Sequence, residues 1–249
     1  TPSGQNQSAE AILLRRFWPL GVTGRDLNGR PIHAFHLSMV DFPNLFKHVS
    51  MDLVVRHNVY LMEKAFRHDP KGQAVMLLDL GSPVEGSTVF GLRNATRWLN
   101  SLLQFVKAMA KIADPFYPES YFRIYFCRLN KVLEKMFRSM SASMAEGTLS
   151  KVELLSKDEV LSSLQTDIPL DSIPPALGGT SKARIVAGGS INDAAVESAK
   201  EEAQRRIEEL GGEIPSEDQA PDSERRASLA GAVVDAVRKS LSRISLPRS

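Results

Sequence analysis

The feature that most constrains this 249-residue chain is an alternation, over residues 31–165, of short apolar runs with longer segments of helical periodicity. The short runs have the length and composition of buried strands, and they occupy residues 31–37, 74–80, 121–127 and 152–155. The other segments repeat their apolar residues every three or four positions, as amphipathic helices do, over residues 42–66, 90–112, 132–144 and 157–165. This alternation predicts an α/β fold with right-handed crossovers and a mixed, mostly parallel sheet.

Two helix boundaries follow from local signals. Residues 42–66 carry one apolar stripe and are predicted to form a single long helix. Proline lacks a backbone N–H and clashes with the preceding turn, so Asp114-Pro115 is predicted to stop the helix of residues 90–112.

The composition changes near Thr180. All Phe, Trp and Tyr residues lie before it, and a segment without aromatic residues buries too little surface to fold easily alone. We therefore divide the chain into an N-terminal extension (1–16), a domain (17–180) and a charged, partly helical or disordered tail (181–249). In the tail, Ser190-x-x-Asp193 has the form of a capping box that opens a helix of residues 190–210, and residues 227–246 form a second helical candidate.

The second tail segment ends in basic residues, and two interpretations stay open. It lies on an anionic membrane surface with its apolar stripe in the interface, or it docks on the domain or on a protein partner. At its start, Arg225-Arg226-Ala227-Ser228 has the form that basophilic kinases accept. Ser228 is therefore a candidate phosphorylation site, with an unmodified serine as the alternative.

Charge and cysteine content exclude several classes of protein. The net charge of +2 argues against a nucleic-acid binder. The lone cysteine, Cys127, excludes an intrachain disulfide framework and suits a reducing, cytoplasmic compartment. The chain has neither a run of roughly 20 apolar residues nor the apolar stretch of a signal peptide, so membrane contact is expected to be peripheral. Because it begins with Thr1, we expect a piece of a longer protein.

The sequence shows no constellation typical of catalysis or metal binding. The patterns C-x-x-C, H-E-x-x-H and G-x-S-x-G do not occur. His33 and His36 are three apart on a predicted strand and point to opposite faces. His48 and His57 are nine apart on a predicted helix and lie on opposite sides of it. We therefore predict a protein that is not an enzyme and that uses no metal or cofactor.

Five short motifs follow one another between Asp26 and Gly179. They are Asp26-x-x-Gly29-Arg30-Pro31, MLLDLG at residues 76–81, Tyr117-Pro118-Glu119, Thr148-x-x-Lys151 and IPPALGG at residues 173–179. Each motif is weak alone, but their order on these elements resembles the CRAL-TRIO domain of phosphatidylinositol-transfer and related lipid-carrier proteins. The resemblance implies a sheet that floors an apolar cavity and a mobile gate helix that closes it.

By this resemblance, the gate helix corresponds to residues 130–145. Its apolar residues are Val132, Leu133, Met136, Phe137, Met140 and Met144. The strand residues expected in the pocket are Tyr121, Ile124 and Phe126. Methionine is flexible and polarizable, which suits a surface that meets both acyl chains and a bilayer. A methionine-containing core helix is the alternative for this segment.

The resemblance places a lipid head group at Glu119, Thr148 and Lys151. Glu119 precedes one predicted strand and Lys151 begins the next, so parallel strands bring both to one end of the sheet. A lysine offers a point charge to a phosphate, and a carboxylate accepts hydrogen bonds from inositol hydroxyls. A simple ion pair between the two is the alternative. Phosphatidylinositol carriers usually have Arg where this chain has Ser120, which leaves the identity of the lipid open.

Together these features predict a protein that binds a phosphoinositide, another phospholipid or a different hydrophobic small molecule. It is expected to carry, present or sense this ligand at membranes, in the cytoplasm and with peripheral membrane contact. The alternative is a non-catalytic protein-interaction module of a larger signalling protein, with a degenerate pocket.

Overall fold

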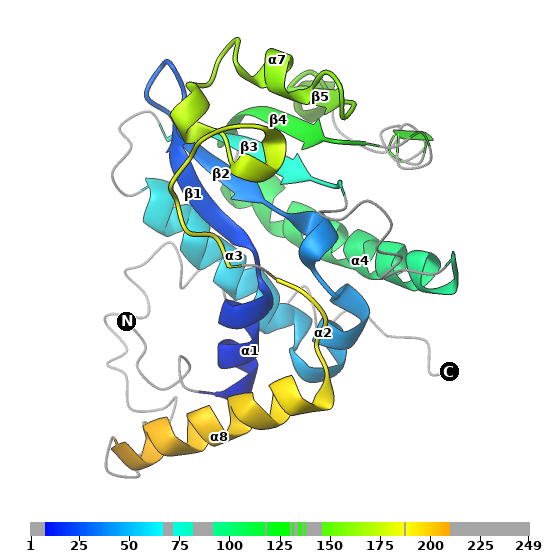
Figure 1. Cartoon of the computed structure of the whole chain (residues 1–249), viewed down its shortest axis with the longest axis vertical. Coiled ribbons are helices and arrows are strands. Elements are labelled where there is room, and N and C mark those ends of the chain that lie inside the picture. Colours follow the sequence, from blue (N-terminus) through cyan, green and yellow to red (C-terminus); the bar gives the residue numbers. More distant parts are fainter. Residues whose placement is uncertain are drawn as a thin grey trace.

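The computed structural model describes residues 8–66, 72–81, 92–117, 119–129, 131, 134, 135, 137, 146–186 and 188–209. Five strands form one sheet in the order β1-β2-β3-β4-β5 (Figure 1). They are β1 (Leu20–Arg25), β2 (Pro31–Phe35), β3 (Ala74–Asp79), β4 (Tyr121–Cys127) and β5 (Val152–Leu155). β1 runs antiparallel to β2, whereas the other three pairs are parallel. The prediction of a mixed, mostly parallel sheet is confirmed.

Helices surround the sheet (Figure 1). They are α1 (Ala9–Phe17), α2 (Phe42–His48), α3 (Met51–Phe66), α4 (Leu92–Phe116), α6 (Glu146–Leu149), α7 (Val160–Leu164) and α8 (Asp193–Glu209), with short 3-10 turns η2 (Leu37–Met39), η3 (Leu170–Ser172) and η4 (Pro175–Leu177). None of the described helices is long and apolar enough to cross a bilayer.

Strand β1 was not predicted, because its sequence LGVTGR contains two glycines, which weaken a strand. The turn that joins it to β2 holds it in place. Asp26 Oδ1 accepts the backbone N–H groups of Asn28 at 2.9 Å and Arg30 at 2.7 Å. Gly29 takes a left-handed backbone conformation with φ of 82°. The first sequence motif therefore forms a hairpin turn.

The prediction of one helix over residues 42–66 is wrong, because the segment forms α2 and α3. Val49 is extended, with φ of −130° and ψ of 126°, and ends α2. Ser50 then accepts the backbone N–H of Leu53 at its side-chain oxygen, at 3.3 Å, and caps α3. The apolar stripe runs across both helices, so the stripe alone does not reveal the break.

The prediction that Asp114-Pro115 stops the next helix is also wrong, because α4 continues to Phe116. Pro115 lies in the last turn, so only the final turn of the helix must accommodate its missing N–H. The capping box at Ser190 is not used either. Asn192 Oδ1 accepts the N–H of Ala195 at 2.9 Å and caps α8, which begins at Asp193.

The first and last described helices pack against each other. α8 buries Val196, Ala199 and Ala203 in the core cluster that also contains residues of α1. Arg16 on α1 forms an ion pair with Glu202 on α8, and its guanidinium donates to Ser198 Oγ at 3.2 Å. Figure 1 shows α8 lying across the end of α1. The second helical candidate, residues 227–246, and Ser228 lie outside the described residues.

Candidate functional site

The two faces of the sheet differ in burial. On one face, side chains of β2 to β5 pack on the segment from α7 to η4 and are buried; they are Ile32, Ala34, Val75, Leu77, Tyr125, Cys127 and Leu155. The strands alternate, so their other residues point to the opposite face, on the side of α3 and α4. On that face α4 covers only part of the sheet: Phe105 packs on Phe35, with ring centroids 6.4 Å apart, and Leu78 joins the same cluster.

The rest of that opposite face forms what we call the apolar floor. It consists of Met76, Ile124, Phe126, Val152 and Leu154, which are partly exposed. The strand register joins them, because Met76 pairs with Ile124, Ile124 with Val152, and Phe126 with Leu154. They belong to none of the core clusters that the described residues form. An apolar sheet surface of this kind, only partly covered by the described residues, is typical of a site that binds an apolar ligand.

One residue of the expected gate segment lies against this floor. The ring of Phe137 is 4.7 Å from the ring of Phe126, centroid to centroid. The other gate residues, Val132, Leu133, Met136, Met140 and Met144, lie outside the described residues. The structure therefore brings two of the residues expected at the pocket and gate together.

The other strand residues expected in the pocket differ in their placement. Ile124 shares the floor, whereas Tyr121 lies at its end and approaches His33. Met76, Val152 and Leu154 were missed, although the period of two along neighbouring strands marks them.

Glu119 and Lys151 meet at the end of the sheet where β4 and β5 begin. Lys151 Nζ donates to Glu119 Oε2 at 2.5 Å. The Glu119 side chain is 71% exposed, against 21% for Lys151. Ion pairs this exposed contribute up to about 1 kcal/mol, so a ligand can replace one at little cost. The side chain of Thr148 is outside the described residues. The ion pair that the sequence left as the alternative is present, and the head-group role stays a prediction.

The backbone of Glu119 has an uncommon conformation at this edge of the sheet. Its φ is 59°, a left-handed conformation that costs a non-glycine residue roughly 1–2 kcal/mol. The neighbouring Ser120 is buried, and its hydroxyl donates to the Tyr117 carbonyl oxygen at 2.8 Å. Ser120 therefore stabilises the turn that holds Glu119. Because serine is neutral, it adds no positive charge beside Glu119 and Lys151.

A buried ionic network lies at the other end of the sheet, and sequence reasoning missed it. Asp79 accepts hydrogen bonds from His36 Nδ1 at 2.8 Å and from two nitrogens of Arg128, each at 2.7 Å. Burial raises the pKa of Asp79, but the hydrogen bonds from His36 and Arg128 outweigh it and hold the pKa below its usual value. Arg128 also donates to the Gly81 carbonyl oxygen at 2.9 Å. The network joins the ends of β2, β3 and β4.

Nothing in this network or elsewhere in the described part of the chain gathers three metal-ligating side chains from His, Cys, Asp and Glu. Cys127 is buried, and burial raises the pKa of its thiol, which keeps it protonated and unreactive. The geometry of the described site, an apolar surface with one charged pair at its edge, suits binding.

Comparisons with known proteins agree with this geometry. A family profile described as the CRAL/TRIO domain matches residues 16–179. The solved structure described as Sfh5 has a TM-score of 0.50 and 19% identity to this chain, and the match covers 79% of this chain and 65% of that one. At this identity the likeness shows the fold, an α/β domain built on a mixed sheet. The chain belongs to the CRAL/TRIO domain family.

The relatives are distant. The chain is 24% identical over 190 residues to "Protein real-time" of Aedes aegypti, covering 72% of this chain and 28% of that protein. It is 21% identical over 173 residues to "Sec14 cytosolic factor" of Schizosaccharomyces pombe, covering 68% and 59%. It is 23% identical over 168 residues to "Phosphatidylinositol/phosphatidylcholine transfer protein SFH4" of Arabidopsis thaliana, covering 66% and 27%. The chain thus spans less than two thirds of each of these relatives.

Proposed function

We propose that this protein binds a phospholipid, with its acyl chains on the apolar floor beneath the segment that contains Phe137, and carries or presents it at membranes. The partial exposure of the floor is the observation that supports this proposal. An acyl chain that covers these side chains gains about 0.8 kcal/mol for each buried methylene, and the exchange needs no covalent chemistry. Two relatives with transfer or cytosolic-factor names are consistent with a cytoplasmic, peripheral carrier.

The head group is proposed to lie at the Glu119–Lys151 pair, with Thr148 beside it. The first step is exchange of the ion pair: the lysine turns to a lipid phosphate, and the freed carboxylate accepts hydrogen bonds from hydroxyls of the head group. The high exposure of Glu119 supports this step, because its carboxylate can rotate away without leaving a buried charge. Phosphatidylinositol and its phosphorylated forms offer both a phosphate for the lysine and hydroxyls for the carboxylate. Ser120 is neutral where phosphatidylinositol carriers usually have an arginine, so the site offers less positive charge to extra phosphates. We therefore favour phosphatidylinositol without further phosphates.

Native mass spectrometry of the purified chain, with a separate extraction that identifies its lipid, tests the proposal. We expect one phospholipid for each chain. Ile124→Asp puts a charge on the floor and should abolish loading without unfolding the protein, because this side chain is not fully buried. If no lipid co-purifies and none can be loaded, the proposal fails and the protein-interaction module becomes the better hypothesis.

Transfer between vesicles tests the head-group site separately. Glu119→Ala should slow the transfer of phosphatidylinositol about tenfold and leave the transfer of phosphatidylcholine unchanged, because only inositol offers hydroxyls to the carboxylate. Lys151→Ala removes a contact to the phosphate that both lipids carry, so it should slow the transfer of both about tenfold. The matched control is Lys200→Ala, which removes a lysine from a pair with Glu197 that is also exposed, on α8. Transfer of phosphatidylinositol by Glu119→Ala and Lys151→Ala at the rate of the unmodified chain would place the pair outside the head-group site.

A further inference from the structure

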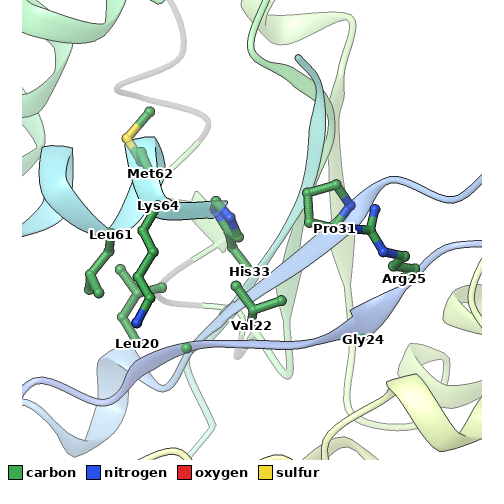
Figure 2. A pocket seen from close by; sticks show the side chains of 10 residues that line it. Leu20, Val22, Gly24, Arg25, Pro31, His33, Leu61, Met62 and Lys64 are labelled. Atoms are coloured by element: carbon green, nitrogen blue, oxygen red, sulfur yellow. The ribbon is translucent and has the colours of Figure 1, made fainter. Parts of the chain in front are cut away.

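A pocket lies at the opposite edge of the sheet from the Glu119–Lys151 pair, between β1, β2 and the second half of α3 (Figure 2). Its volume of about 390 Å³ falls within the roughly 300–1,000 Å³ of small-molecule sites. The wall is mainly apolar and includes Leu20, Val22, Pro31, Leu61 and Met62. Val22 is 48% exposed, so this wall opens to the outside. The pocket therefore has the size and lining to take a small apolar molecule.

His33 gives the pocket a polar group. Its side chain is buried, and burial lowers its pKa to about 4, so the imidazole is neutral at pH 7. Nδ1 lies 3.5 Å from the Tyr121 hydroxyl oxygen. Burial raises the pKa of this hydroxyl, which keeps it protonated and able to donate. The ring of Phe66 also lies beside the imidazole, with the two ring centroids 5.8 Å apart.

The tautomer of His33 decides whether its Nε2 donates or accepts a hydrogen bond. A neutral imidazole that accepts a hydrogen bond at Nδ1 carries its hydrogen at Nε2. Nε2 is buried and has no hydrogen-bond partner among the described residues. A buried donor without an acceptor is unfavourable, and the pocket is where an acceptor can come from. In the tautomer that accepts from Tyr121, Nε2 is a donor, and a ligand with an acceptor oxygen satisfies it.

The charges at the pocket select the sign of the ligand. Lys64 is exposed and extends from α3 toward β1 across the pocket (Figure 2). Arg25 lies at the far end of the same lining, where its guanidinium donates to the Gly29 carbonyl oxygen at 2.6 Å. No acidic side chain is among the described residues that line the pocket. The opening is therefore positive and favours an anion.

The strand register separates this pocket from the head-group pair. His33 pairs with Met76, Met76 with Ile124, and Ile124 with Val152, which follows Lys151. Three strand spacings of about 4.8 Å place His33 some 14 Å from Val152. A ligand in the pocket and a head group at Lys151 are thus held by different side chains.

We propose that this pocket is a second binding site, and that it takes an amphipathic carboxylate such as a fatty acid. The alkyl chain packs on the apolar wall formed by Leu20, Val22 and Leu61. The carboxylate, which only accepts hydrogen bonds, receives the Nε2–H of His33, and Lys64 supplies the positive charge that balances it. This site does not depend on phospholipid binding at the apolar floor.

Isothermal titration of the delipidated full chain with three ligands of equal alkyl length tests the proposal. Dodecanoate should bind, dodecan-1-ol should bind about tenfold more weakly, and dodecylamine should not bind. Lys64→Met should weaken dodecanoate about tenfold and leave dodecan-1-ol unchanged, whereas His33→Phe should weaken both. Val22→Trp fills the pocket from an exposed position that does not threaten folding, and it should abolish the binding of dodecanoate and dodecan-1-ol.

Lys200→Met on α8 is the matched charge control and should change nothing. The proposal is overturned if Val22→Trp and Lys64→Met bind dodecanoate like the unmodified chain. If binding is instead lost in Ile124→Asp or Lys151→Met, the fatty acid occupies the apolar floor, and the pocket is not its site. Equal binding of dodecanoate, dodecan-1-ol and dodecylamine also contradicts the proposal, because it shows only unselective apolar binding.

Discussion

Leu154 and Leu155 are consecutive residues of β5 that face opposite sides of the sheet and meet different surroundings. Leu155 is 7% exposed and packs in the core cluster formed with α7 and η4. Leu154 belongs to the apolar floor, is partly exposed and joins none of the core clusters of the described residues. One strand therefore contributes to folding with one side chain and to the proposed lipid site with the next.

This difference predicts unequal costs for the same substitution. Leu155→Ala should lower the free energy of unfolding by about 2–4 kcal/mol, because it opens a cavity in a closed core. Leu154→Ala should cost less than about 1 kcal/mol, because its side chain is already partly exposed. Urea unfolding of the lipid-free chain measures both. Equal losses would mean that the floor is packed like an ordinary core face.

The contact between α8 and α1 predicts that α8 contributes to stability. Ala199 is 0% exposed, whereas Ala194, five residues earlier on another side of the helix, is exposed. Ala199→Arg should therefore lower the free energy of unfolding by about 2–3 kcal/mol, by overpacking and by burying a charge. Ala194→Arg on the same helix is the matched control and should stay within about 0.5 kcal/mol of the unmodified chain. A thermal melt that responds equally to both would show that α8 is not part of the folded unit.

The sequence predicted the parts of the fold that depend on period and composition. β4, residues 121–127, matches the prediction at both ends, because six of its seven residues are aromatic, β-branched or otherwise apolar. β1 was missed because Gly21 and Gly24 weaken its pattern. Its stability comes from pairing with β2 and from contacts distant in sequence, such as the hydrogen bond that the Ser181 hydroxyl donates to the Thr23 carbonyl oxygen. The break at Val49 was missed because a cap at Ser50 depends on one side-chain hydrogen bond within a continuous stripe.

The candidate site was predictable to a similar extent. The meeting of Glu119 with Lys151 followed from parallel strands alone, without contact data. Two features did not follow. The Asp79–Arg128 pair depends on the left-handed backbone of Arg128, with φ of 59°, and no sequence signal marks that conformation in a non-glycine residue. His33 Nε2 has no hydrogen-bond partner among the described residues, and this follows from which side chains pack around it. The sequence alone does not show that packing.

The buried network predicts a large effect for one arginine and a small effect for another. Arg128→Met removes the main partner of a buried carboxylate, so it should lower the free energy of unfolding by about 3–5 kcal/mol. Arg56→Met breaks the more exposed i,i+4 pair with Asp52 on α3 and should cost about 0.5 kcal/mol. Urea unfolding at pH 7 compares them. Similar small losses would show that Asp79 is solvated rather than buried.

Histidine burial predicts how stability depends on pH. The pKa of His33 is lowered by burial from 6.5 to about 4 in the folded protein. Between these values the unfolded state binds a proton that the native state does not, so stability falls as the pH falls from 6.5 to 4. This difference in pKa corresponds to about 3 kcal/mol in the free energy of unfolding for one histidine. Asp79 acts outside this window, because its pKa lies below its usual value and its stabilising charge is lost only at lower pH.

Free energies of unfolding between pH 7 and pH 4, from urea titrations, measure this dependence. The unmodified chain should lose stability across the window, and His33→Phe should lose about half as much, because His57 has a pKa similarly lowered by burial and by nearby Arg15. His48→Phe, at an exposed histidine, is the matched control and should follow the unmodified chain. A His33→Phe curve parallel to that of the unmodified chain would mean that His33 takes up its proton in the native state at an ordinary pH, and Nε2 would then need an acceptor within the fold itself.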